Sequence, residues 1–129
     1  MKEKVKKYLN DRKCGVIATC KDNKPRASTV VYYSEGWTIY FCTGLNSTKI
    51  KNIKANPNVS IAVDDQYNGT GCFQADGVAT ILTEKQKEEI AKKFEKLNRP
   101  DRVVIRIDLK KISFVEDHHH REEIVRFEV

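Results

Sequence analysis

The chain has 129 residues, of which 40% are hydrophobic and 33% are charged, and its formal net charge is +6 at pH 7. This balance is typical of a folded globular protein and argues against a disordered one. The length favours a single domain over residues 1–129, and no apolar run approaches the length of a membrane span, so we expect no membrane partner.

The four cysteines, at positions 14, 20, 42 and 72, have no Cys-x-x-Cys spacing. The absence of that spacing argues against zinc-ribbon and thioredoxin-like proteins. The first nine residues are charged and amphipathic, without the apolar core of a signal peptide. We therefore expect reduced cysteines and a cytoplasmic location.

The first half of the chain predicts short elements with short connections. A three-residue segment that ends in Gly36 predicts a hairpin between two of the strands. A helix begins after Ser47, a good N-cap residue, and ends before Pro57. The predicted elements are a helix over 2–10, strands over 14–20, 26–33 and 37–42, and this helix.

The second half predicts longer strands. Gly77 suggests a bend or bulge, and the capping box Thr83–Gln86 begins a helix that ends near Asn98. The apolar positions 103, 105, 107 and 109 alternate with polar ones, as in a half-buried strand. The predicted elements are strands over 59–64, 72–82, 102–115 and 124–129, a loop over 66–71, and the helix. Seven strands and three helices predict a mainly β protein, a six- to seven-stranded antiparallel barrel with peripheral helices.

The segment 43–53 contains the best candidate site. A helix N-terminus has unpaired N–H groups and a partial positive charge, both of which favour phosphate. The hydroxyls of Thr43, Ser47 and Thr48 and the ammonium of Lys49 would add to that preference. A plain helix cap with a solvated lysine explains the same residues about equally well.

The strand over 26–33 supplies further candidates. Arg26 begins the strand that we expect to pair with the strand leading to Ser47, so its guanidinium could reach the same phosphate. Ser28, Thr29 and Val30 would lie beside a flat heterocycle on that wall of the barrel. Taken alone, these three residues are better explained by ordinary strand propensity.

These segments together resemble the pyridoxamine 5′-phosphate oxidase-like family of FMN-binding split barrels. The resemblance lies in the order Pro25-Arg26-Ala-Ser-Thr-Val-Val, the Gly36 hairpin, Tyr40-Phe-Cys-Thr43, Ser47-x-Lys49-x-x-Asn52-Ile53, and Asn56-Pro-Asn-Val-Ser-Ile61. It covers roughly residues 12 to 82 by motif and the remainder by architecture.

The resemblance implies that FMN binds at the interface of a homodimer. By position, Arg26, Ser47 and Lys49 would contact the phosphate, with Thr48 where the founding enzyme has an arginine. The isoalloxazine ring would lie on the segment 28–30, and Cys42 and Thr43 would lie at its edge. Gln74 is included because the family often has a glutamine near this position.

We therefore expect an FMN-dependent oxidoreductase that passes hydride or electrons from a reduced donor to a small-molecule acceptor. In such proteins the cofactor performs the redox chemistry, and the protein positions and tunes it. The founding enzyme's long C-terminal substrate motif is missing, which argues against pyridoxamine phosphate oxidation itself.

Two other hypotheses remain open. His118, His119 and His120 lie among carboxylates and could bind a metal or haem, which would indicate a flavin or haem carrier. Because neighbouring side chains of an extended segment alternate in direction, a polar loop without metal is the better interpretation. A basic barrel with aromatic residues also suggests nucleic-acid binding, but no recognition signature is present, so we expect no nucleic-acid partner.

Overall fold

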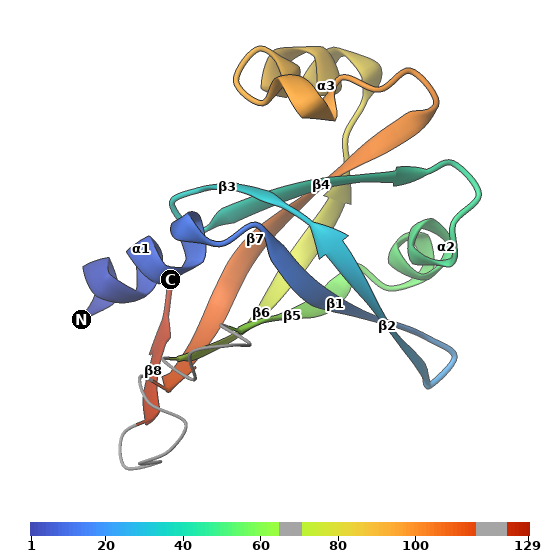
Figure 1. The fold of residues 1–129 in the computed structure, drawn as a ribbon. Coiled ribbons are helices and arrows are strands. Elements are labelled where there is room, and N and C mark those ends of the chain that lie inside the picture. The colour runs from blue at the N-terminus through green and yellow to red at the C-terminus, as the bar shows by residue number, and fades with distance from the viewer. Residues whose placement is uncertain (65–70, 116–123) are drawn as a thin grey trace.

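The computed structural model describes residues 1–64, 71–115 and 124–129. In these residues one antiparallel sheet is flanked by three α-helices (Figure 1). The helices are α1 (Lys2–Asp11), α2 (Thr48–Ala55) and α3 (Glu84–Ala91), followed by a short 3-10 helix, η1 (Glu95–Leu97). The strands are β1 (Cys14–Lys21), β2 (Lys24–Val31), β3 (Tyr33–Glu35), β4 (Thr38–Gly44), β5 (Asn58–Asp64), β6 (Cys72–Ile81), β7 (Arg102–Val115) and β8 (Ile124–Glu128).

The strand order makes the sheet curl. The hydrogen-bonded strands follow one another in the order β2-β1-β5-β6-β7-β4-β3, and β8 pairs with β7 outside this order. The strands β2 and β3 lie at opposite ends of that order, yet only Tyr32 separates them in the chain. The two edges must therefore approach each other, which confirms the expected split-barrel class of fold.

The predicted strand over 26–33 is wrong as a single element. Its first part, β2, pairs with β1 through a two-residue turn, and only β3 pairs with β4. Asp22 and Asn23 in that turn both have positive φ, the conformation of tight hairpins, and these residue types tolerate it. The buried Tyr32 ends β2, donating its backbone N–H to the Lys13 carbonyl and its hydroxyl to the Leu9 carbonyl. The described residues therefore contain eight strands instead of seven.

The predicted helix to Asn98 is also shorter than expected, because α3 ends at Ala91. The carbonyl of Ile90 accepts the backbone N–H groups of both Lys93 and Phe94, which tightens the chain into a turn before η1. The expected capping box at Thr83 and Gln86 is present. The register of β6 against β7 shifts between Asp76 and Gly77, so the predicted bulge is confirmed.

The main core fills the inside of the curled sheet. The alternation predicted for β7 holds from Ile105 through Ile107 to Leu109, which are buried. It fails at the start of the strand, where Val103 is only half-buried and Val104 is buried in a second core. Helix α1 adds Val5, Tyr8 and Leu9 to the same core. A smaller second core lies between α3, η1, β4 and β7, where it includes Leu82, Leu97 and Val104 and the partly buried Tyr33, Tyr40, Cys42, Ile90 and Phe94.

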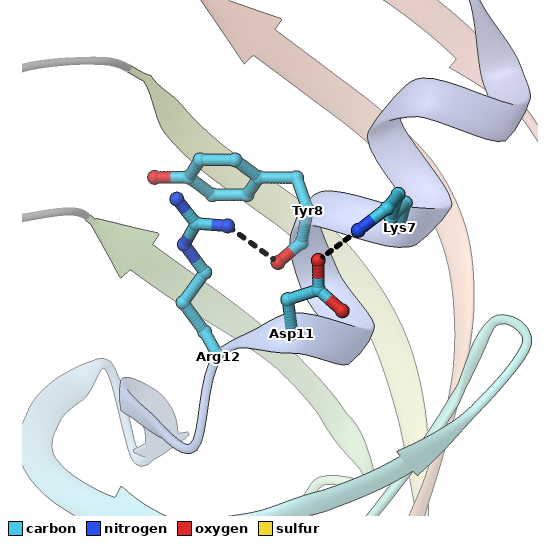
Figure 2. Close-up of polar contacts among 4 residues, drawn as sticks. All are labelled: Lys7, Tyr8, Asp11 and Arg12. Atoms are coloured by element: carbon cyan, nitrogen blue, oxygen red, sulfur yellow. Dashed lines mark hydrogen bonds and ion pairs between the residues drawn. The ribbon is translucent and has the colours of Figure 1, made fainter.

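Helix α1 is fixed at its C-terminal end by polar contacts (Figure 2). The Tyr8 hydroxyl donates to the Gly71 carbonyl at 2.9 Å. The Arg12 guanidinium lies 3.6 Å from the centre of the Tyr8 ring and donates to the Tyr8 carbonyl. On the exposed side, Lys7 pairs with Asp11 at 2.6 Å. The Tyr8 bond therefore ties α1 to the residue that precedes β6.

No helix in the described ranges is long and apolar enough to cross a membrane. Most of the predicted loop over 66–71 and the whole histidine run 118–120 lie outside the described residues.

Candidate functional site

The start of α2 has the predicted N-cap. The Ser47 side chain accepts the Ile50 N–H at 3.3 Å, and the Ser47 N–H donates to the Gly44 carbonyl at 3.1 Å. Lys49 lies half-buried in the first turn. The turn from β4 into α2 therefore brings an ammonium group to a helix N-terminus, as the sequence predicted.

A buried hydrogen bond fastens α2 to the sheet. The Asn52 side-chain amide donates to the Thr19 hydroxyl at 3.0 Å, and both residues are buried. Arg26 is the cross-strand partner of Thr19 in β2. Because directly opposite residues project to the same side of a sheet, exposed Arg26 lies on the α2 side. It reaches this side by pairing with β1, and not through the expected pairing with β4.

A cleft of about 580 Å³ opens between β2, β4, α2 and the segment from η1 to β7. This size is in the range of small-molecule sites. It gathers residues from segments that are far apart in the sequence. Its lining consists of Thr29, Val30, Val31, Tyr33, Cys42, Thr43, Lys49, Glu95, Lys96, Asn98, Arg99 and Arg102.

Five of the ten predicted contact residues line this cleft, namely Thr29, Val30, Cys42, Thr43 and Lys49. Four others lie on the same elements but outside the lining, namely Arg26, Ser28, Ser47 and Thr48. Gln74 is not brought to the cleft. It is exposed on β6 and lines a separate hollow of about 440 Å³ with Lys111, Ser113 and Arg126 among its other residues.

The cleft is strongly cationic. Lys49, Lys96, Arg99 and Arg102 line it, and Glu95 is the only acidic residue among its described lining residues. Sequence reasoning missed Lys96, Arg99 and Arg102. Arg102 is the register partner of Gly44, the residue where β4 ends before the turn into α2. That long-range pairing places Arg102 near Lys49 in space, and no local pattern indicates it.

Two buried polar atoms at or beside the cleft lack hydrogen-bond partners within the described part of the chain. They are the Ser28 hydroxyl oxygen and the Arg102 Nε. Buried donors and acceptors in folded proteins are nearly always paired. The unpaired Arg102 Nε, on a residue that lines a cationic cleft, therefore fits a ligand that offers a hydrogen-bond acceptor.

The described residues contain no group of three or more side chains suited to bind a metal ion. The four cysteines are free. Burial, assisted by the neighbouring Asp64 carboxylate, raises the pKa of the Cys72 thiol. The raised pKa makes the Cys72 thiol less nucleophilic.

The curled antiparallel sheet, with its cleft beside a helix N-terminus, places the protein among the split barrels. The chain belongs to the pyridoxamine 5′-phosphate oxidase family, whose sequence model matches residues 1–116. It is 34% identical over 71 residues to general stress protein 26 of Bacillus subtilis (strain 168). That match covers 55% of this chain and 51% of the relative, so the alignment spans about half the length of the curated relative.

Solved structures share the fold at low sequence identity. General stress protein 26 of Bacillus anthracis superposes with a TM-score of 0.74 at 23% identity, covering 98% of both chains. A FAD-binding protein of Mesorhizobium loti gives 0.71 at 24% identity, over 87% of this chain and 91% of that one. A haem-binding protein of Mycobacterium smegmatis superposes with a TM-score of 0.77 at 16% sequence identity, covering 98% of this chain and 57% of that one.

Proposed function

We propose that the protein binds FMN in the cleft between β2, β4 and α2 and acts as an oxidoreductase. The observation that carries this proposal is the assembly of Thr29, Val30, Cys42, Thr43 and Lys49 around one cavity. The resemblance in sequence implies an FMN contact for each of these five residues. The family and the flavin-binding neighbour support a flavin in general, and the helix start with Lys49 favours a ligand with a terminal phosphate.

In this proposal each segment has a separate role. The N-terminus of α2 and Lys49 hold the phosphate, with Arg26 on the same side of the sheet. The small and β-branched residues of β2 form an apolar wall for the ring, and the second core beneath Cys42 excludes water from below. A bound flavin supplies the redox chemistry, accepting hydride or electrons from a reduced donor and passing them to a small acceptor.

We propose further that the working form is a homodimer. The outer face of β1, β2 and β6 exposes apolar side chains, with Val16 40%, Val31 55% and Val78 36% exposed. Val31 also lines the cleft. A second copy covering this face would enclose the open side of the cleft and shield these valines from water.

The visible absorption spectrum of the purified protein tests the cofactor. We expect flavin absorption bands at about 370 nm and about 450 nm, each within about 10 nm because the protein tunes the electronics of the ring. We also expect to recover FMN after acid extraction. Reconstitution of flavin-free protein with FMN should restore the bands. Failure to take up FMN or riboflavin at about 100 μM would contradict the proposal.

A haem spectrum in the same experiment would favour the second candidate function, a haem carrier. The haem-binding structural neighbour motivates this arm. Replacing His118, His119 and His120 together by alanine then decides whether that run binds the haem. We expect no haem in the wild type, and the same FMN affinity in the wild type and in this triple variant.

A further inference from the structure

Lys87 is a buried charged residue that the proposed function does not use. It lies on α3 and is only 5% exposed. Its Nζ donates to the backbone carbonyls of Arg99 and Arg102, the latter at 2.7 Å. Both carbonyls belong to the turn that joins η1 to β7. The buried ammonium therefore holds this turn against α3.

The same turn carries two of the cationic side chains that line the cleft. Arg99 is exposed, whereas Arg102 is half-buried with its Nε buried and unpartnered within the described ranges. A buried donor without an acceptor lowers the stability of the fold. That cost is removed when an acceptor from a ligand meets the Nε group.

Charge points to the same kind of ligand. Lys87 forms no ion pair with a carboxylate of residues 1–64, 71–115 or 124–129, and neither do Arg99 and Arg102. Three cations thus lie on or behind one turn, and Glu95 is the only acidic residue among the described residues that line the cleft. An oxyanion in the cleft would neutralise them, and a fixed guanidinium is suited to bidentate contact with phosphate or carboxylate.

We infer that the turn 99–102 is a preorganised oxyanion site of the cleft, in which Arg102 contacts the anion and Lys87 is a positioning residue. This inference rests on the proposed function for the identity of the cleft's main ligand. The oxyanion is either the phosphate of the flavin or the phosphate or carboxylate group of the second reactant. Both sources present the same chemistry to Arg102.

Arg102→Gln distinguishes the two sources when it is compared with wild type for FMN and riboflavin binding by flavin fluorescence. If the flavin phosphate is the anion, FMN affinity falls about tenfold to a hundredfold and riboflavin affinity does not change. If the second reactant supplies it, both flavin affinities stay constant. In that case inorganic phosphate should perturb the flavin spectrum of the FMN-loaded wild type but not that of Arg102→Gln.

The positioning role of Lys87 is tested with Lys87→Met, which removes both hydrogen bonds, and Lys87→Gln, which keeps N–H donors. Lys92→Gln, an exposed cation outside the cleft, is the matched control. Lys87→Met should reproduce the anion effect of Arg102→Gln, and Lys87→Gln should retain part of the wild-type response to the anion. The double variant that combines Lys87→Met with Arg102→Gln should lose no more of this response than either single variant. Additive losses would show that Lys87 acts only on general stability.

The inference is overturned if Arg102→Gln alters neither FMN affinity nor the response to inorganic phosphate. Its failure can be separated from failure of the proposed function. If the wild type binds no flavin at all, the proposed function fails, and the oxyanion site is then tested on flavin-free protein. There, stabilisation of the wild type but not of Arg102→Gln by inorganic phosphate supports the site, and equal stabilisation rejects it.

Discussion

At the scale of single residues, Lys49 offers the most direct test of the proposed phosphate site. It lies in the first turn of α2 and lines the cleft. We expect Lys49→Ala to weaken FMN binding about tenfold to a hundredfold and riboflavin binding much less, because only FMN has the phosphate. Lys51→Ala, an exposed lysine of the same helix, is the control. Equal losses for both flavins would remove Lys49 from the phosphate site.

Tyr32 gives a prediction for stability against pH. Burial raises the pKa of Tyr32 well above its ordinary range, and its hydroxyl donates to the Leu9 carbonyl at 2.6 Å. A phenol whose pKa is higher in the folded than in the unfolded state stabilises the fold below about pH 10. That contribution declines as the pH rises above this value, by up to about 1.4 kcal/mol per unit.

Tyr32→Phe should therefore lower the free energy of unfolding by about 0.5–1.5 kcal/mol at neutral pH. Urea unfolding at several pH values measures the difference between variant and wild type. This difference should shrink between about pH 10 and 11. A difference that stays constant over this range would show that the phenol does not titrate differently on unfolding.

At the same scale, the candidate site divides into residues that local patterns reveal and residues that they do not. The helix start with Ser47 and Lys49 has a local signature, and its prediction was confirmed as an N-cap. Arg102 has none, since only the pairing of β4 with β7 brings it to the cleft. Lys87 did have a signal. It lies three residues before the apolar Ile90, and residues three apart share one face of a helix. This spacing predicts that Lys87 lies on the buried face of α3.

At the scale of elements, the bulge in β6 depends on the absence of a side chain. A Cβ added to Gly77 would lie 2.8 Å from the Asp108 carbonyl oxygen and 2.8 Å from Ile107 Cγ2. We expect Gly77→Ala to destabilise the protein by about 1–3 kcal/mol, since backbone of β7 must move. Gly44→Ala is the control, because no atom lies within 4 Å of its added Cβ. Chemical denaturation of both variants makes the comparison, and equal stabilities would contradict the prediction.

The elements also show why some boundaries were predictable and others were not. The capping box of α3 and the bulge at Gly77 each depend on a few adjacent residues. The division of the segment 26–33 into β2 and β3 depends on Tyr32, whose hydroxyl and N–H partners come from residues 9 and 13. The segment 26–33 is rich in β-branched and aromatic residues throughout, so its composition does not show where the pairing changes from β1 to β4.

At the scale of the whole molecule, the exposed apolar face of the sheet leads to a prediction for assembly. Val16→Lys should leave the fold intact, because the side chain already contacts water and does not line the cleft. In a dimer the added charge would be buried, so sedimentation velocity at micromolar concentration should show a monomer. We expect FMN affinity to fall with dissociation. Val129→Lys, at an exposed apolar position of the C-terminus, is the control.

Two outcomes would contradict this arrangement. One is a flavin-saturated wild-type monomer at micromolar concentration. The other is a Val16→Lys dimer of undiminished stability, which would place the interface on another face.

The passage of the chain through Tyr32 from one edge of the sheet to the other bears on the order of folding. The strands β1 and β2 are joined by two residues and pair along their whole length, so their hairpin requires little loop closure. The strand β4 must find β7 across most of the chain, with Thr38 opposite Asp108. Distant pairings of this kind slow folding. We expect the hairpin to be formed in the transition state and the β4–β7 seam to close late. Destabilising substitutions in the turn at Asp22 and Asn23 should then slow refolding, whereas those along the seam should mainly accelerate unfolding.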